Sequence, residues 1–194
     1  EETEQLWMEI VATDSGEQWC EVDPDTMKEL VDADPAEFVW ASNPFPCQSA
    51  TFQTFGCLIL WFGWYGFNGA STLGLADGYA GIAAKVMVNT TMAAAAGALT
   101  VGLLYQLIDG VQDLGSMSNG ILAGLVSITS ACSTVEPWAA IVCGIVGGIV
   151  YYFAVILLEK LRIDDVVLAV PVHCFCGIWG VIAAGLFPST MSTY

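Results

Sequence analysis

The sequence contains very few positively charged residues. Its 194 residues include only 4 Lys and Arg against 20 Asp and Glu, which gives a formal net charge of −16. A protein that binds nucleic acid needs clusters of cations to neutralise phosphates, so a nucleic-acid partner is excluded. Charged residues make up 12% of the chain, well below the roughly 25% of soluble domains. The chain therefore cannot cover a globular surface with charged side chains.

The sequence divides into parts of different composition. Hydrophobic residues make up 56% of the chain, which excludes a disordered protein. Of the 20 acidic residues, 13 lie within residues 1–37. Pro44 and Pro46 favour extended or turn backbone and mark the change in composition. We predict an acidic extramembrane arm at residues 1–49, a membrane domain at 50–188 and a short tail at 189–194.

Apolar runs follow one another after residue 50. A membrane-spanning helix needs about 20 predominantly apolar residues. Such runs predict five helices, at residues 52–75, 79–108, 119–133, 137–158 and 166–187. The third run is short for a span, and residues 109–118 before it are predicted to form a polar loop. The sequence therefore predicts an all-α integral membrane protein with about five transmembrane helices and an acidic N-terminal arm.

The acidic arm also contains apolar residues at helical spacing. They are Trp7, Ile10 and Val11, followed by Met27, Leu30 and Val31. We predict one or two short amphipathic helices in the arm that dock on another surface. The alternative is a disordered acidic tail.

The seven cysteines do not indicate a disulfide framework, because most of them lie in apolar segments, where cysteine behaves as a small hydrophobe. His173, Cys174 and Cys176 are close in sequence, but one helix without a second pair of ligands does not predict a metal site. We expect no metal and no other cofactor, although lipid or pigment contacts stay open for a chain inside a larger assembly. No nucleophile–base pair or phosphate loop indicates an enzyme.

His173 is the only histidine of the chain and lies within the last predicted span. Ionisable residues within a membrane call for a functional hypothesis. Burial disfavours the imidazolium, so we expect a neutral ring that both donates and accepts a hydrogen bond. Such a ring could pass a small polar molecule or a proton along a narrow apolar channel. The alternative is a histidine satisfied by the carbonyl of a neighbouring helix.

Six motifs follow one another through the apolar part of the chain. They are LWFGWYGFNG at residues 60–69, VNTT at 88–91 with AAAAG at 93–97, NGILAGLV at 119–126, TVEPWAA at 134–140, KLRIDD at 160–165, and PVH at 171–173 with CGIWG at 176–180. In this order and at this spacing they closely resemble the ammonium transporter family, which includes methylammonium permeases and Rhesus proteins. The resemblance covers about residues 50–188 and is to the second five-helix repeat of an algal-type member.

The resemblance implies a fold of two inverted five-helix repeats that works as a trimer, with one pore per subunit. It assigns His173 as one of two pore histidines, Phe67 as one of two stacked phenylalanines above the pore, and Ser71 as a hydroxyl of the outer ammonium-recruitment site. Asp165 matches a structural carboxylate that caps a helix end. In family members, ammonium is recruited by cation–π contact and hydrogen bonds, loses its proton, and ammonia passes the histidines.

The chain also departs from the family pattern. Cys174 stands where the family usually has glycine, and Val166 replaces a proline. Only the second repeat is matched, so the other pore histidine and the rest of the gate would come from elsewhere. The expected partners are membrane lipids and other membrane protein subunits that cover the His173 face, because polar groups are costly against lipid.

Two functions follow from the resemblance. The first is a half-channel that contributes to ammonium or ammonia conduction with a partner. The alternative is a non-transporting accessory subunit of a larger membrane assembly, such as a photosynthetic or respiratory supercomplex, derived from a transporter half. The sequence predicts an integral membrane protein of the plasma membrane or of an organelle membrane, such as the thylakoid or inner mitochondrial membrane.

Overall fold

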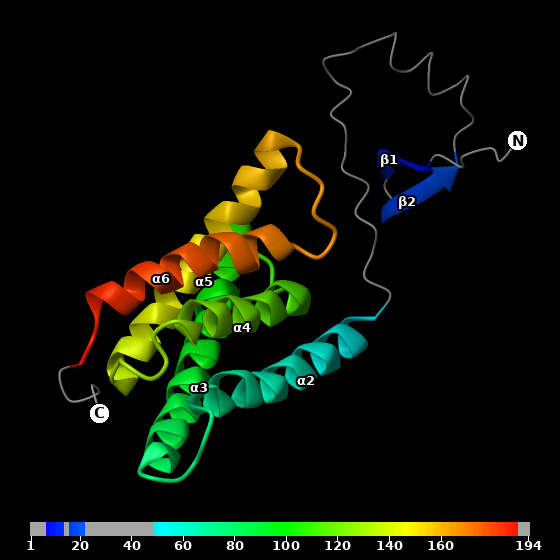
Figure 1. Cartoon of the computed structure of the whole chain (residues 1–194). Coiled ribbons are helices and arrows are strands. Elements are labelled where there is room, and N and C mark those ends of the chain that lie inside the picture. Colours follow the sequence, from blue (N-terminus) through cyan, green and yellow to red (C-terminus); the bar gives the residue numbers. More distant parts are fainter. Residues whose placement is uncertain (1–6, 14–15, 22–48, 190–194) are drawn as a thin grey trace, which may run out of the picture. The chain divides into compact units, whose positions relative to one another are not determined.

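The computed structural model of the chain describes residues 7–13, 16–21 and 49–189. The chain divides into two compact units, residues 1–48 and residues 49–194. The described part of the first unit is a β-hairpin, and the described part of the second is a bundle of helices (Figure 1).

The hairpin consists of strands β1 (Trp7–Thr13) and β2 (Gly16–Glu21), which pair antiparallel with Trp7 opposite Glu21. The predicted helix around Trp7, Ile10 and Val11 is therefore wrong. Ile10, Val11 and Thr13 are β-branched, and a strand accommodates such side chains with less loss of rotamer freedom than a helix. The second predicted helix, around residues 27–31, lies outside the described residues.

Helices form nearly all of the described part of the second unit. In chain order the helical segments are α2 (Ala50–Gly69), η1 (Ala70–Thr72), α3 (Tyr79–Leu104), η2 (Tyr105–Asp109), α4 (Leu114–Thr129), α5 (Pro137–Leu161), η3 (Val170–Phe175) and α6 (Cys176–Leu186). The η1 segment is a 3₁₀ turn, whereas η2 and η3 are π-helical continuations of α3 and α6. The prediction of about five helices in this unit is confirmed.

The local sequence explains where several helices begin. The Ser49 hydroxyl accepts a hydrogen bond from the first turn of α2. Pro137 occupies the first position of α5, where its missing N–H costs nothing and its fixed φ suits the helix. At the other end of α5, Arg162 adopts a left-handed conformation with φ 55° and terminates the helix.

Helix α4 begins five residues before its predicted start at Asn119. The polar composition of residues 109–118 predicted a loop, but Leu114–Thr129 is helical throughout. The Asp113 carboxylate accepts hydrogen bonds from the backbone N–H groups of Gly115 (3.1 Å) and Ser116 (2.6 Å). These bonds satisfy donors that a helix start leaves unpaired, so the cap outweighs the polar composition.

Helix α3 packs against both α4 and α5, and glycines set the separation (Figure 1). A Cβ atom added to Gly124 of α4 would meet the carbonyl oxygen of Ala93 in α3, and one added to Gly144 of α5 would meet the same oxygen. A Cβ on Gly97 would meet the carbonyl oxygen of Gly120. Helix backbones approach this closely only where side chains are small, which is a common way for membrane helices to associate.

A buried amide holds the connection between α4 and α5 in place. Asn89 of α3 is fully buried, and its Nδ2 atom donates to the carbonyl oxygens of Cys132 and Val135, both at 2.9 Å. Because these carbonyls lie between two helices and have no ladder partner there, Asn89 supplies the donors that burial of the turn requires.

Two of the described helical stretches are long and apolar enough to cross a membrane by length and composition, Tyr79–Asp109 and Pro137–Leu161. The helices Leu114–Thr129 and Val170–Leu186 are apolar but shorter. Large apolar side chains also lie on the outside of α2, where Phe52 and Phe62 are each 78% exposed. An apolar outer surface of this kind fits contact with lipid or with further helices.

The close packing at Gly124 predicts that a larger residue there lowers the stability of the bundle. Gly124→Ala forces the backbones of α3 and α4 apart, and we expect a loss of about 1–3 kcal/mol of stability, as for other overpacked sites. Gly185→Ala in α6 is the matched control, because a Cβ there meets nothing within 4 Å. Thermal unfolding in detergent should show a lower Tm for Gly124→Ala alone. Equal Tm values would show that the contact does not constrain the bundle.

The Asp113 cap predicts that the stability of the bundle depends on pH. Burial raises the pKa of Asp113, but hydrogen bonds from the Ser116 side chain and from the backbone of Ser116 and Gly115 outweigh burial and lower the pKa below its ordinary value. A lowered pKa gives stability that is present above the unfolded-state pKa of about 4 and is lost as the pH falls through the folded-state pKa. We expect Asp113→Ala to cost about 1 kcal/mol at neutral pH.

The control for this cap is Asp113→Asn, which still accepts hydrogen bonds but does not titrate. Unfolding in detergent between pH 3 and pH 7 should show a stability loss for the wild type relative to Asp113→Asn at the acidic end only. If the stability of both proteins depends on pH in the same way, the Asp113 carboxylate does not contribute to stability through this cap.

Candidate functional site

A cavity of about 720 Å³ lies between α2, α4 and the last helix. It is lined by Ile59, Leu60, Gly63, Trp64 and Phe67 of α2, by Val126, Thr129 and Ser130 from α4 and its end, and by His173 and Gly177. Two of the three predicted pore or substrate residues, Phe67 and His173, thus lie on one cavity although they are more than 100 positions apart in sequence. We call it the His173 cavity.

His173 is exposed in the described chain. We expected a histidine buried within a span, and the alternative was a ring bonded to a neighbouring helix carbonyl. The ring is open to the cavity and makes no hydrogen bond to another described residue, so a bond to a neighbouring helix carbonyl is not found among the described residues. Burial of the ring within a membrane or under a partner stays a prediction. Both ring nitrogens are therefore available to a molecule in the His173 cavity.

The position of His173 follows from the start of its helix. The Asp165 carboxylate accepts hydrogen bonds from the backbone N–H groups of Ala169 (2.9 Å) and Val170 (2.6 Å), just before and at the beginning of η3. Asp165 therefore caps this helix start, and the span begins later than its predicted start at residue 166. Within η3, the N–H of Cys176 bonds to the carbonyl of Pro171 over the five-residue interval of a π-helix.

Two polar residues of the His173 cavity were not predicted from the sequence. The Trp64 indole N–H donates to the Thr129 hydroxyl at 2.9 Å, and Thr129 in turn donates to the Leu125 carbonyl at 2.7 Å. The Trp64 ring also lies 6.0 Å from the Phe67 ring, centre to centre. Trp64 belongs to an aromatic-rich run in the sequence, and hydrophobic packing is sufficient to explain each aromatic residue there. Only the fold shows that Trp64, among these residues, makes a hydrogen bond in the cavity.

Ser71 does not line the His173 cavity. Its hydroxyl donates to the Phe67 carbonyl oxygen at 2.5 Å, and its side chain lies on a separate, more polar pocket beyond the end of α2. The structure therefore places Phe67 with His173, and Ser71 next to Phe67 along the chain but on another hollow.

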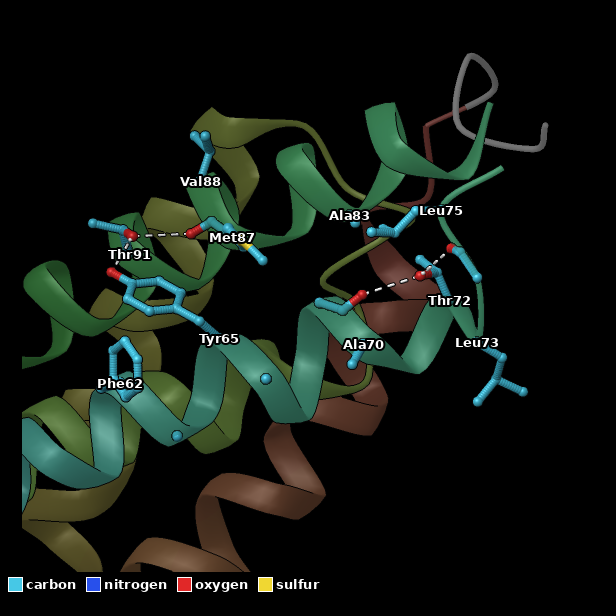
Figure 2. Close-up of a pocket in the computed structure, with 14 residues that line it drawn as sticks. Phe62, Tyr65, Ala70, Thr72, Leu73, Leu75, Ala83, Met87, Val88 and Thr91 are labelled. Atoms are coloured by element: carbon cyan, nitrogen blue, oxygen red, sulfur yellow. Dashed lines mark hydrogen bonds between the residues drawn. The ribbon is translucent and has the colours of Figure 1, made fainter. Parts of the chain in front are cut away.

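A third hollow, of about 950 Å³, is a mostly apolar groove between α2, η1 and α3 (Figure 2). Tyr65 and Thr91 bond to each other across it, with their hydroxyl oxygens 2.8 Å apart. Because Thr91 donates to the Met87 carbonyl, the Tyr65 hydroxyl is the donor of this pair. No predicted site residue lies in this groove.

The cysteines near His173 face different surroundings. Cys174 is exposed, whereas Cys176 is buried with its sulfur 3.4 Å from the Gly147 carbonyl. Among the described residues, no three His, Cys, Asp or Glu side chains come together as ligands for a metal ion.

The described residues thus form a helical bundle of the kind found in polytopic membrane transport proteins, with a histidine open to a cavity between three helices. Residues 36–193 match the model of the Ammonium Transporter Family. The chain belongs to this family and is an integral membrane protein.

Several curated relatives support this membership. The chain is 45% identical over 147 residues to ammonium transporter Amt2 of Archaeoglobus fulgidus, an alignment that covers 75% of this chain and 31% of the relative. It is 41% identical over 143 residues to ammonium transporter 3 of Dictyostelium discoideum, covering 73% and 33%. The chain therefore spans about a third of the length of the curated relatives it matches.

Solved structures agree with the fold. The crystal structure of Candida albicans Mep2 matches with a TM-score of 0.69 at 35% identity, covering 75% of this chain and 31% of that chain. A structure described as a Sensor Amt Protein matches with a TM-score of 0.70 at 34% identity, covering 75% and 35%. The predicted resemblance to the ammonium transporter family is confirmed.

The cap at Asp165 predicts that this carboxylate holds η3, and with it His173, in place. Asp165→Ala removes the acceptor for two backbone N–H groups, and we expect a loss of about 1 kcal/mol and a loosened η3 around His173. Reaction of the exposed Cys174 with a membrane-permeant maleimide, monitored in detergent, reports on η3. The rate of this reaction should differ between Asp165→Ala and the wild type.

The neighbouring Asp164 provides the control, since it makes no hydrogen bond to a described side chain or backbone group. Asp164→Ala should leave both Tm and the Cys174 reaction rate unchanged. If the two alanine variants behave alike, Asp165 does not position the His173 helix.

Proposed function

We propose that this chain forms one side of a pathway for ammonia, and that further membrane helices, from a partner, form the other side. Ammonium would be recruited at one end and lose its proton, and ammonia would pass His173. The single observation that carries the proposal is the His173 cavity, because it joins an exposed imidazole to the Phe67 ring in an otherwise apolar hollow.

The chemistry of this cavity suits a small neutral molecule. A neutral imidazole offers one donor and one acceptor, which matches the capacity of ammonia to accept and to donate hydrogen bonds. The other lining side chains include Ile59, Leu60 and Val126, and none of the lining residues carries a carboxylate, Lys or Arg. An apolar passage without fixed charge favours ammonia over the ammonium ion, whose desolvation is costly.

The open side of the cavity supports a partner. Phe67 is 64% exposed and His173 is exposed, so the groups that would contact the passing molecule lie on the surface of this bundle. A polar ring that faces hydrocarbon is unfavourable, and helices that pack over it would both cover the ring and close the passage. We therefore propose that other membrane protein subunits cover the His173 face, as the sequence led us to expect.

The alternative is an accessory subunit that does not transport. The large exposed apolar side chains of α2, such as Phe52 and Phe62, favour it as well, because they offer an extended surface to neighbouring membrane proteins. In that case a foreign helix, lipid or pigment would fill the His173 cavity, and no substrate would pass.

Uptake measurements test the proposal. The tagged chain is purified with its natural partners, the assembly is reconstituted in liposomes, and influx of ammonia is followed by an internal pH dye after an ammonium pulse. We expect influx above that of empty liposomes, and a reduction of about tenfold or more in His173→Ala, since a group that handles a proton contributes at least this much.

The matched control is Val181→Ala, which truncates a 67% exposed side chain of the same helix away from the His173 cavity. It should conduct like the wild type. An intact assembly that gives no influx above empty liposomes excludes conduction and favours the accessory subunit. Equal influx through wild type and His173→Ala shows that any conduction bypasses this cavity.

A further inference from the structure

The helical register changes within the last span, next to His173. In α6 the buried residues Cys176, Gly180 and Ala183 recur at intervals of four and three, as on one face of an α-helix. If the same register continued backwards, this face would include His173, three residues before Cys176. His173 is exposed instead.

The π-turn of η3 accounts for this difference. Its last hydrogen bond joins the Cys176 N–H to the Pro171 carbonyl across five residues instead of four. The wider turn puts Pro171 and Val172 on the buried face, and both are buried. It thereby turns His173 off this face and towards the His173 cavity. The direction of the imidazole therefore depends on a kind of turn that is rare in helices and concentrated at functional sites.

Cys176 fixes the end of this turn through two of its groups. Its backbone N–H closes the π-turn, and its thiol donates to the Gly147 carbonyl of α5, with the sulfur 3.4 Å from the oxygen. The side chain is 0% exposed and packs in the same buried cluster as Val172. One turn later the Trp179 indole donates to the Cys143 carbonyl at 3.0 Å, which ties α6 to α5 a second time.

Ser127 of α4 occupies the space beside this contact. A Cβ atom added to Gly147 would meet the Ser127 hydroxyl oxygen, and one added to Gly180 would meet the Ser127 carbonyl oxygen. The helices α4, α5 and α6 therefore meet beside Cys176 with little space to spare. The Cys176 side chain has one place between them, and that place sets the register of the turn before it.

We propose that Cys176 is a positioning residue for His173: its thiol, held by the Gly147 carbonyl, keeps the five-residue turn of η3 and so directs the imidazole into the His173 cavity. The inference rests on the proposed function, because ammonia meets the ring only if the ring faces the cavity. Without the thiol, the Cys176 N–H can bond to the carbonyl four residues before it, that of Val172, and this α-helical register carries His173 towards the packed face.

The direction of the ring is measured on the full chain in detergent, by the rate at which diethyl pyrocarbonate modifies His173. His173 is the only histidine of the chain, so a tag without histidine lets mass spectrometry assign the product. We expect Cys176→Ala to slow this reaction about threefold to fivefold, as loss of one hydrogen bond allows. Cys176→Val fills the place of the thiol without a donor and should slow the reaction as well. Cys176→Ser keeps a donor and should react like the wild type.

The matched control is Cys143→Ala. Cys143 is also 0% exposed, but it belongs to the other buried cluster of the bundle. Thermal unfolding should show similar losses of Tm for Cys143→Ala and Cys176→Ala, because each truncates a buried thiol. Only Cys176→Ala should slow the reaction of His173, whereas a general loosening of the bundle would change the reaction in both.

Influx into liposomes measures the consequence in the reconstituted assembly. Cys176→Ala should lower the maximal rate of influx about threefold to fivefold with little change in KM, because it turns His173 and leaves the entry of substrate unchanged. Cys176→Ser should restore the maximal rate.

The positioning role is overturned if His173 reacts at the wild-type rate in Cys176→Ala and Cys176→Val, or if Cys176→Ser reacts as slowly as Cys176→Ala. Failure of the proposed function gives a different result. A reaction slowed by Cys176→Ala, in a chain whose assembly gives no influx, keeps the positioning role and excludes conduction. Influx that depends on His173 but not on Cys176 keeps conduction and excludes the positioning role.

Discussion

The close approach of α3 to α4 and α5 is the contact on which the remaining structure depends. The carbonyl oxygen of Ala93 lies so near both partner helices that neither Gly124 nor Gly144 has room for a Cβ atom. In lipid there is little hydrophobic gain from bringing two apolar helices together, so dispersion contacts between close backbones have to hold them. Around these three helices, α2 packs against α3 and α4, and α6 packs against α4 and α5.

The arrangement of α2, α4 and α6 explains why the polar groups gather in two places. Between these helices lies the His173 cavity, with His173 and Phe67 on its open side. At the end of the bundle the chain turns twice, and turns expose carbonyl groups that need donors. The hydroxyls of Ser71, Thr72 and Thr134 donate to such carbonyls, and all three line the polar pocket beyond the end of α2.

Much of this architecture could be predicted from the sequence, because it depends on local signals. Apolar runs indicated the helices, and Pro137 marked the start of α5 correctly. The start of α4 was predicted too late, since the prediction followed the polar composition of residues 109–118, whereas the cap at Asp113 starts the helix at Leu114. The strand Trp7–Thr13 was predicted as a helix, because spacing alone does not separate a short β-branched strand from one turn of an amphipathic helix.

The sequence by itself determined the family, the helical class and the identity of the rare polar residues within apolar runs, because these follow from composition and short-range pattern. Only the tertiary structure decided which of these residues meet. Phe67 and His173 share one cavity while Ser71 lies on another, and the Trp64 indole of α2 finds its acceptor in Thr129 of α4. The physical reason is that contacts between helices decide which residues line the same cavity and which groups form hydrogen bonds. The sequence of a single helix does not contain this information.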